Sequence, residues 1–478
     1  MSAAMRGLFL SLAAPVSLAA QASVHTRPPA LPQPAPLTVP AARNASLPNG
    51  IRLQIVEQHE LPLVQVTFSV TGGSRLDGTA PGLATFMAGM LDEGAGTRDA
   101  LALQGELAFL GASLFSSADW DRFTVSLKVP ARSLAAALTL MADVVQRPTF
   151  RADEVRRQRD LRLTSLLQAR DQPGAVAGLA FNQVVFPASH HYHRSALGDS
   201  VTVAGFDSAG VRAFYDAVLR PDRARLFVVG DVTEEQVRSL MTGQFGSWRA
   251  RGRAAPLPAA APTVSHPPTT RVYLVDKPGA PQSVILIGWP GVARTSPDYP
   301  ALSVMNTLLG GSFSSRLMTN LRETRAYTYG ASSGFSYRAI PGPFTAAAQV
   351  RTNVTDSSLV EFFRELRAIR DTPVPANELD RGKAYVELDI PGSLETTSQI
   401  AGQMSDLAVF GLTLEDLPRL ASQVRAVSAA DVQRVARSYL TPDQAYVVVV
   451  GDLSKVKGPI EALNLGPVTI LELDKVAR

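Results

Sequence analysis

Apolar residues recur along this chain with two periods, one typical of strands and one typical of helices. Over residues 123–127 every second residue is apolar, which predicts a half-buried strand. Over residues 134–145 apolar residues recur at helical spacing, and Pro148 ends the predicted helix. Two short apolar runs that close with glycine, RLFVVG at 225–230 and YVVVVG at 446–451, predict further strands. This mixture predicts an α+β fold with sheets covered by helices.

Two pairs of similar segments lie at corresponding places in the two halves of the chain. RPDRARLFVVGDV at 220–232 is similar to TPDQAYVVVVGDL at 441–453, with the same Pro-Asp and Gly-Asp positions. Upstream, ADEVRRQRDL at 152–161 is similar to ANELDRGKAY at 376–385. One type of domain, used twice, is the simplest explanation of this repetition.

Stretches rich in proline and alanine suggest the domain boundaries. The stretch at 251–269 lies near the middle of the chain and is predicted to be an interdomain linker. It separates a predicted N-terminal lobe, 46–250, from a C-terminal lobe, 270–474. A second such stretch at 23–45 is predicted to be a spacer before the first lobe.

The first residues have the features of a secretory signal. A short basic start is followed by an apolar run at 7–20 and by the small-x-small site Ala20-Gln21-Ala22. We therefore expect residues 1–22 to be a cleaved signal peptide and the mature protein to be periplasmic. The run is too short to span a membrane, and no later stretch is long enough, so we expect no membrane span.

Composition narrows the class of protein. The chain has 478 residues, with 46% hydrophobic and 18% charged residues, as in folded globular proteins. Its formal net charge is only +4 and its basic residues form no block, which argues against nucleic acid as a partner. It contains no cysteine, which excludes disulfides, thiolate metal ligands and cysteine nucleophiles.

The histidines do not form a known zinc motif. HELPL at 59–63 begins like H-E-x-x-H but ends in leucine, and Pro62 would break the helix that this motif needs. The cluster HHYH at 190–193 has the composition of a metal site, but no carboxylate lies at a useful spacing. We therefore expect this cluster to be an exposed polar loop.

A serine hydrolase is also disfavoured. GASSG at 330–334 matches the nucleophile-elbow pattern G-x-S-x-G. The elbow must join a strand to a helix, whereas aromatic alternation continues on both sides of this segment. The partner histidine should also follow the serine, and the last histidine of the chain is His266. A bend within a sheet is the simpler interpretation.

Several segments, in this order and spacing, resemble the pitrilysin/insulinase-type zinc metallopeptidases, the inverzincins. They are LPNGIRLQIVEQHELPLVQVTFSVTGGSRLD (47–77), GELAFLGASLFSS (105–117), ADVVQRPTF (142–150) and LLGGSFSSRLMTNLRETRAYTYGASS (308–333). The resemblance covers nearly the whole predicted mature chain. It implies two homologous lobes, each a mostly antiparallel sheet covered by helices, which together form half of a clamshell.

The resemblance also implies that the zinc site is degenerate. In active relatives the opening helix reads roughly G-L-A-H-F-L-E-H-M, where two histidines bind zinc and the glutamate between them is the general base. In the matching GLATFMAGM the three positions are Thr85, Ala88 and Gly89. The third ligand, a glutamate on a later helix, falls on Thr164. Since none of these side chains is an imidazole or a carboxylate, we expect no metal in this chain.

A second part of the family's machinery is retained. Relatives carry an arginine and, seven residues later, a tyrosine that bind the substrate carbonyl and the developing oxyanion. Arg322 and Tyr329 match this spacing in LRETRAYTYG. Tyr327 stands where relatives usually have an aliphatic residue, so a register shifted by two residues would give Tyr327 the role.

Taken together, the resemblance favours the zinc-free subunit of a heterodimeric peptidase. A homologous partner would supply the zinc and the general base, and this chain would supply Arg322, Tyr329 and part of the chamber that receives a peptide. The alternative is a catalytically silent scaffold or peptide-binding protein of the same fold. The retained arginine and tyrosine argue against a pure scaffold.

Overall fold

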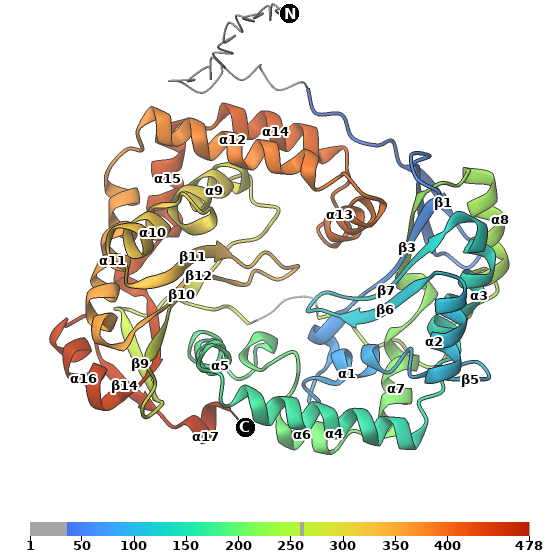
Figure 1. Ribbon diagram of the computed structural model, residues 1–478, viewed down its shortest axis with the longest axis horizontal. Helices are drawn as coiled ribbons and strands as arrows, with labels where there is room; N and C mark the ends of the chain where they lie inside the picture. The colour runs from blue at the N-terminus through green and yellow to red at the C-terminus, as the bar shows by residue number, and fades with distance from the viewer. Residues whose placement is uncertain (1–35, 259–261, 478) are drawn as a thin grey trace, which may run out of the picture. The chain divides into compact units, whose positions relative to one another are not determined.

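The computed structural model describes residues 36–258 and 262–477 (Figure 1). The predicted signal peptide and most of the predicted spacer lie outside the described residues. Contacts divide the chain into the units Met1–Pro36 and Leu37–Arg478, and every helix and strand named below belongs to the second unit. Among the described residues, no helix combines the length and the apolar character needed to cross a membrane.

The first half of the chain forms a six-stranded sheet. Its strands are β1 (Arg43–Ser46), β2 (Arg52–Glu57), β3 (Leu63–Thr71), β6 (Ser113–Ala118), β7 (Arg122–Pro130) and β8 (Ala224–Gly230). Their order is β1-β2-β8-β3-β7-β6, and only the β2–β8 pair is parallel. On β7, Phe123, Val125 and Leu127 are buried and the residues between them are partly exposed, which confirms the half-buried strand predicted there.

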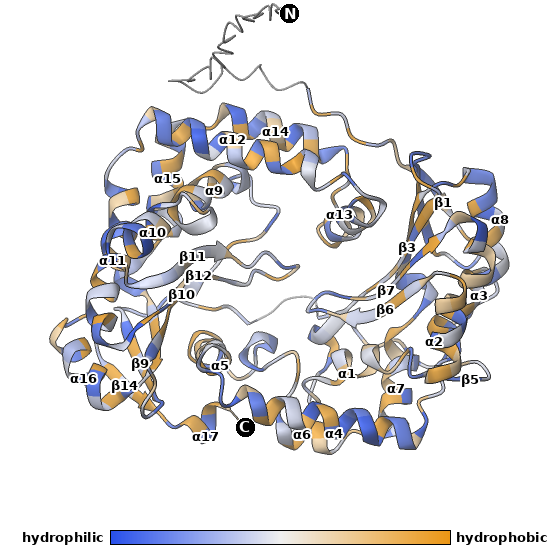
Figure 2. Ribbon diagram, viewed as in Figure 1, coloured by the Kyte–Doolittle hydropathy of each residue, from blue (hydrophilic) through white to orange (hydrophobic). Residues whose placement is uncertain are grey.

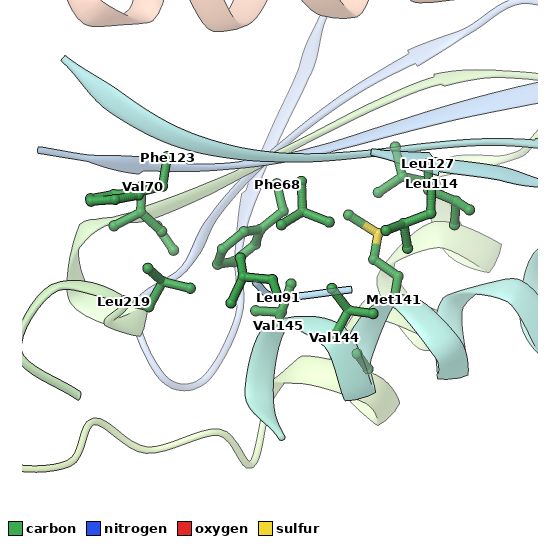
Figure 3. Packing of buried hydrophobic residues seen from close by; sticks show 14 of the residues in the cluster. Phe68, Val70, Leu91, Leu114, Phe123, Leu127, Met141, Val144, Val145 and Leu219 are labelled. Carbon is green, nitrogen blue, oxygen red and sulfur yellow. The ribbon is translucent and has the colours of Figure 1, made fainter. Parts of the chain in front are cut away.

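Helices cover one face of this sheet and build the first core. The helices of this half are α1 (Leu83–Gly89), α2 (Ala100–Phe109), α3 (Leu134–Gln146), α4 (Ala152–Ala169), α5 (Pro173–Val185), α6 (Ser200–Ala204), α7 (Ser208–Val218) and α8 (Glu234–Phe245), with the small hairpin β4 (Gly94–Ala95) and β5 (Arg98–Asp99). Figure 3 shows Phe68 and Leu127 of the sheet packed against Met141 and Val144 of α3. The helix predicted from the apolar spacing at 134–145 is confirmed as α3.

The second half repeats this plan. Its strands are β9 (Arg271–Asp276), β10 (Gln282–Pro290), β11 (Thr328–Phe335), β12 (Pro343–Arg351), β13 (Tyr446–Gly451) and β14 (Val468–Leu471). Its helices are α9 (Tyr299–Asn306), α10 (Arg316–Met318), α11 (Thr355–Asp371), α12 (Ala376–Gly392), α13 (Thr397–Val409), α14 (Asp416–Ala426), α15 (Ala429–Tyr439), α16 (Leu453–Ala462) and α17 (Leu473–Val476). Figure 2 shows helices with both hydrophilic and hydrophobic residues, as expected of helices that cover a core.

The strand orders of the two sheets correspond at five of six positions. The second sheet has the order β14-β9-β13-β10-β12-β11, in which β9 to β11 correspond to β2, β8, β3, β7 and β6. The edge strands differ, because β1 is antiparallel to β2 whereas β14 is parallel to β9. The repeated segments ending in Gly-Asp therefore form equivalent strands, β8 and β13, each between a parallel and an antiparallel neighbour. Two homologous sheets in the two halves confirm the fold class expected from the sequence.

Each sheet is also covered by one helix from the other half of the chain. Helix α5 lies on β10 and β13, where Val176 and Phe181 are buried beside Val448. Helix α13 lies on β3 and β8, where Ile400 and Met404 are buried. This exchange joins the two halves through apolar contacts, and the repeats in the sequence gave no sign of it.

Candidate functional site

The helix α1 stands where the resemblance puts the zinc motif. Its core-facing residues Phe86 and Met87 are buried. The Asp77 carboxylate accepts hydrogen bonds from the N–H groups of Gly82, at 2.9 Å, and Ala84, at 2.7 Å, and so caps the start of the helix. Burial nevertheless raises the pKa of Asp77 to about 7. The helix is therefore anchored at its first turn by a carboxyl group and along one face by apolar packing.

The three motif positions have different surroundings. Thr85 is half-buried, and its hydroxyl donates to the carbonyl of Ala196 at 2.8 Å, with the carbonyl of Gly82 at 3.1 Å. Ala88 is fully buried, whereas Gly89 is exposed. Thr85 therefore serves to connect α1 with the loop that contains Ala196.

A guanidinium group occupies the neighbourhood of Thr85. Nη1 of Arg162, on α4, donates to the Thr85 hydroxyl at 3.1 Å and to the carbonyl of Leu197 at 3.2 Å. Its Cζ lies 6.0 Å from the centre of the Phe86 ring, and burial lowers its pKa. Thr164, two residues further along α4, is exposed and donates to the carbonyl of Asp160 within its own helix, at 2.9 Å. The side chain that links α4 to α1 is therefore Arg162.

The residues at this site do not fit a zinc ion. Zinc needs imidazole, carboxylate or thiolate ligands, and Thr85, Ala88 and Gly89 supply none of these. The guanidinium of Arg162 places a positive charge beside Thr85, which would repel a second cation. In residues 36–258 and 262–477, no three His, Cys, Asp or Glu side chains form a group that could hold a metal.

Arg322 lies on a π-helical turn, Thr319–Thr324, of the second half. Such turns are rare and often occur at functional sites. The turn is fixed to α11 by Asn320, whose Nδ2 donates to Glu361 Oε2 and to Glu365 Oε1, each at 2.8 Å. Arg325 adds an ion pair to Glu361 at 2.9 Å. These polar contacts, of which the Asn320–Glu361 hydrogen bond is buried, hold the backbone that carries Arg322.

A β-bulge on the edge strand β11 directs Tyr329 outward. Thr328 pairs with Val350 and Ala331 pairs with Ala348, so Tyr329 and Gly330 together face one residue of β12. An extra residue of this kind bends the strand and changes the direction of a side chain. Tyr329 is 85% exposed, which leaves its phenol free to donate a hydrogen bond.

Arg322 and Tyr329 lie together, as the resemblance implies. The Arg322 Cζ is 4.8 Å from the centre of the Tyr329 ring and 4.7 Å from that of Phe313, and its Nε is 3.2 Å from Glu323 Oε1. Tyr327 instead packs against the core of the second half, so Tyr329 is the tyrosine beside the arginine. Phe313, which is 66% exposed, was missed by the sequence interpretation. The signal was an aromatic residue within the Gly/Ser stretch GGSFSS.

The histidine cluster is not the exposed loop expected from the sequence. His190 is only 3% exposed, and its Nδ1 accepts a hydrogen bond from the N–H of Tyr192 at 3.1 Å. The prediction was wrong because residues far away in the sequence cover the cluster: the Trp120 ring centre lies 6.0 Å from that of His191, and the Arg338 Cζ lies 4.4 Å from the ring centre of Tyr192. Burial, together with the charge of Arg338, lowers the pKa of His190 to about 4 and that of His191 to about 3. GASSG, by contrast, lies within β11, which confirms the strand context expected for it.

Two groupings of the candidate residues result. Thr85 and Arg162 meet in the first half, and Arg322, Tyr329 and Phe313 meet in the second. Thr164 joins neither group. The first grouping lies where the resemblance implies a metal site and contains none of its ligands, and the second presents a phenol and part of a guanidinium to solvent.

Two family models match parts of this chain. The model of the family described as "Insulinase (Peptidase family M16)" matches residues 54–184. The model described as "Peptidase M16 inactive domain" matches residues 206–386, a range that includes Arg322 and Tyr329.

Similar proteins come from several bacteria. An uncharacterized zinc protease of Mycobacterium leprae is 29% identical over 66% of this chain and 74% of its own, and one of Bacillus subtilis is 21% identical over 84% and 96%. The crystal structure of a peptidase M16 inactive domain from Pseudomonas fluorescens has a TM-score of 0.80 at 26% identity, covering 86% of this chain and 98% of that one. A Helicobacter pylori protease, at 21% identity, has the same fold with a TM-score of 0.80, over 86% of this chain and 100% of that one. By its sequence and by its fold, the chain belongs to peptidase family M16.

Proposed function

We propose that this chain is the zinc-free subunit of a two-chain M16 peptidase and that it supplies Arg322 and Tyr329 to a zinc site of its partner. One observation carries the proposal. The residues of a zinc site are replaced by Thr85, Ala88 and Gly89, with a guanidinium beside them, whereas Arg322 and Tyr329 are held together and partly open to solvent. A chain that had lost all catalytic use would have no reason to keep the second arrangement.

The chemistry of the pair suits peptide hydrolysis. Attack on a peptide carbonyl develops negative charge on its oxygen, and donors already aimed at that oxygen lower the barrier. The guanidinium of Arg322 and the phenol of Tyr329 are such donors. The bulge and the π-helical turn fix the backbone on both sides of the pair, so little reorganisation is needed during the reaction. The substrate is a peptide, and the zinc and its general base belong to a homologous partner.

The first residues of the chain support a place of action for the proposed peptidase. The basic start, apolar run and small-residue site at 1–22 support export through a cleaved signal peptide. We propose that the two-chain peptidase works in the periplasm, where unfolded or extended peptides would be its substrates.

Peptide cleavage by reconstituted chains tests the proposal. This chain alone should be inactive with zinc present, and activity should appear when a homologue with an intact H-x-x-E-H helix is added. Tyr329→Phe should lower kcat roughly a hundredfold, because it removes one oxyanion donor. Tyr385→Phe, which changes another exposed tyrosine on α12, is the matched control and should have no effect.

A catalytically silent scaffold is the second candidate. The hydrogen bonds of Arg162 favour this candidate, because they tie α1 to α4 through side chains of this chain alone. A stable complex with the homologue, in which cleavage is the same with and without Tyr329→Phe, would support the scaffold and contradict the catalytic role.

A further inference from the structure

A cavity of about 780 Å³ adjoins the loop whose carbonyls accept hydrogen bonds from Thr85 and Arg162, and neither Arg322 nor Tyr329 lines it. It is formed by the C-terminal end of α4, by α5, by the loop 193–199 and by the last described residues 475–477, with Arg338 from the second half. Figure 1 shows α4, α5 and α17 in this region. The volume is in the range of cavities that bind small ligands or short peptide segments.

Arg338 is held rigidly at the wall of this cavity. Its Cζ lies 4.4 Å from the ring centre of Tyr192 and 5.0 Å from that of Trp120. The next residue, Ala339, donates its N–H to Asp121 at 3.0 Å, which fixes the loop that carries the arginine. A guanidinium stacked on aromatic rings keeps its N–H groups available at its edge.

Two arginines that line the cavity form no ion pair with a carboxylate among the described residues. Arg194 is exposed, and in the described part of the chain neither Arg194 nor Arg338 has a carboxylate within ion-pair distance. Arg170 and Lys475, also in the lining, are paired with Asp474 and Glu472.

The lining contains one carboxylate among the described residues, and it is already used. Asp199 Oδ1 accepts from both the N–H and the hydroxyl of Thr202, each at 2.8 Å, and caps α6. The Asp199 carboxylate is therefore engaged in capping α6. Two arginines remain whose charge an incoming ligand could neutralise.

The rest of the wall has the character of a site for a peptide backbone. Gly174, Ala175 and Gly178 of α5 present almost no side chain, and a methyl group placed on Gly178 would meet no other atom within 4 Å. The amide side chain of Asn182 lies further along the same helix and can both donate and accept. Small residues allow close approach of a chain, and an amide can pair with its peptide groups.

We infer that this cavity binds an acidic peptide segment, with Arg194 and Arg338 receiving its carboxylates. The choice of a peptide as the ligand rests on the proposed function, whereas the preference for negative charge rests on the two arginines alone. Arginine pairs with carboxylates through two parallel hydrogen bonds, which gives the site both affinity and a preferred orientation of the ligand. The cavity would thus select acidic stretches of a substrate and hold them away from the cleavage site.

Fluorescence anisotropy with the isolated full chain tests this inference without the partner. The probes are a labelled peptide of alternating Glu and Ala and the same peptide with Gln in place of Glu. The acidic peptide should bind roughly tenfold more tightly than its Gln version, and Arg194→Gln or Arg338→Gln should remove that difference. Arg132→Gln, which alters an exposed arginine of the first half, is the control and should bind as the wild type does.

Arg194→Glu provides a variant that does not disturb the aromatic stack. It should reverse the preference, so that the Gln peptide binds more tightly. Equal binding of the two peptides by the wild-type chain, no binding of either, or unchanged preference in Arg194→Glu would overturn the inference. Because the partner and Arg322 take no part in this assay, its failure leaves the cleavage experiment unaffected, and loss of cleavage without loss of binding would reject the proposed function alone.

Discussion

Arg162 connects α1 and α4 through Thr85, one of the positions where the resemblance implies a metal ligand. Its guanidinium satisfies the Thr85 hydroxyl and the carbonyl of Leu197, two acceptors in a partly buried setting. The Arg162 side chain thus links α4 to α1 and to the loop that contains Leu197. These two hydrogen bonds hold α1 against α4 and the loop at 196–197.

Arg162→Met should lower the free energy of unfolding by about 1 kcal/mol, because it removes two hydrogen bonds in a partly exposed setting. Denaturant unfolding followed by circular dichroism measures the change. Arg156→Met, on the same helix but exposed, is the matched control and should change the free energy by less than about 0.5 kcal/mol. Equal effects of the two substitutions would show that the hydrogen bonds of Arg162 carry no stability.

The buried histidines should make stability fall in mild acid. The lowered pKa values of His190, about 4, and His191, about 3, mean that both are neutral in the folded chain where the unfolded chain already binds protons, below about pH 6.5. Stability is therefore lost as the pH falls from about 6.5 towards 4. Asp77, whose pKa is raised to about 7, acts in the opposite direction.

Comparison of a variant with the wild type separates the histidines from Asp77. His191→Gln removes one of the two titrations, so the free energy of unfolding should fall less between pH 7 and pH 4.5 than in the wild type. Urea unfolding at the two pH values measures this. A loss of stability with the same slope in both proteins would mean that His191 is not kept neutral by burial.

At the scale of elements, two irregular pieces of backbone position the reactive pair. The π-helical turn Thr319–Thr324 carries Arg322, and the bulge at Tyr329–Gly330 directs the tyrosine. Both depend on contacts to neighbouring elements, the turn on α11 through Asn320 and the bulge on β12. Asn320 is thus a positioning residue that touches neither substrate nor metal in the proposed reaction.

Asn320→Ala should lower kcat of the two-chain peptidase roughly tenfold and change KM little. A displaced Arg322 would stabilise the transition state less, while its binding of the ground-state substrate would change little. Steady-state cleavage kinetics give the split between kcat and KM. Asn353→Ala, in an exposed turn of the same half, is the control. An unchanged kcat, or a loss confined to KM, would contradict a positioning role.

Periodicity predicted the elements well where one face of each is buried. The strand β7, the helix α3 and the equivalent strands β8 and β13 were all identified from apolar spacing. The bulge in β11 was not predicted. A bulge depends on how two strands pair, and the apolar pattern of a single strand does not show that pairing. The buried cluster at His190 was missed for a similar reason, since burial there comes from neighbours that the local composition does not indicate.

At the scale of the molecule, the sequence repeats predicted two equivalent sheets, and the resemblance singled out candidate site residues on each half. The degenerate positions and the Arg322–Tyr329 pair were both located by their order in the chain. Arg162 and Phe313 were not, since each acts through contacts between segments that the motifs do not describe. The exchange of α5 and α13 was likewise hidden, because an amphipathic helix does not show which sheet it covers.

The central claim is that Arg322 of this chain acts at a zinc site that belongs to the partner subunit. It is tested most directly by kcat/KM of the reconstituted pair with Arg322→Gln in this chain and the zinc-bearing homologue unchanged. We predict a fall of roughly a hundredfold or more, with zinc content and complex formation unaltered. A pair that cleaves peptides at the wild-type rate with Arg322→Gln would contradict the account.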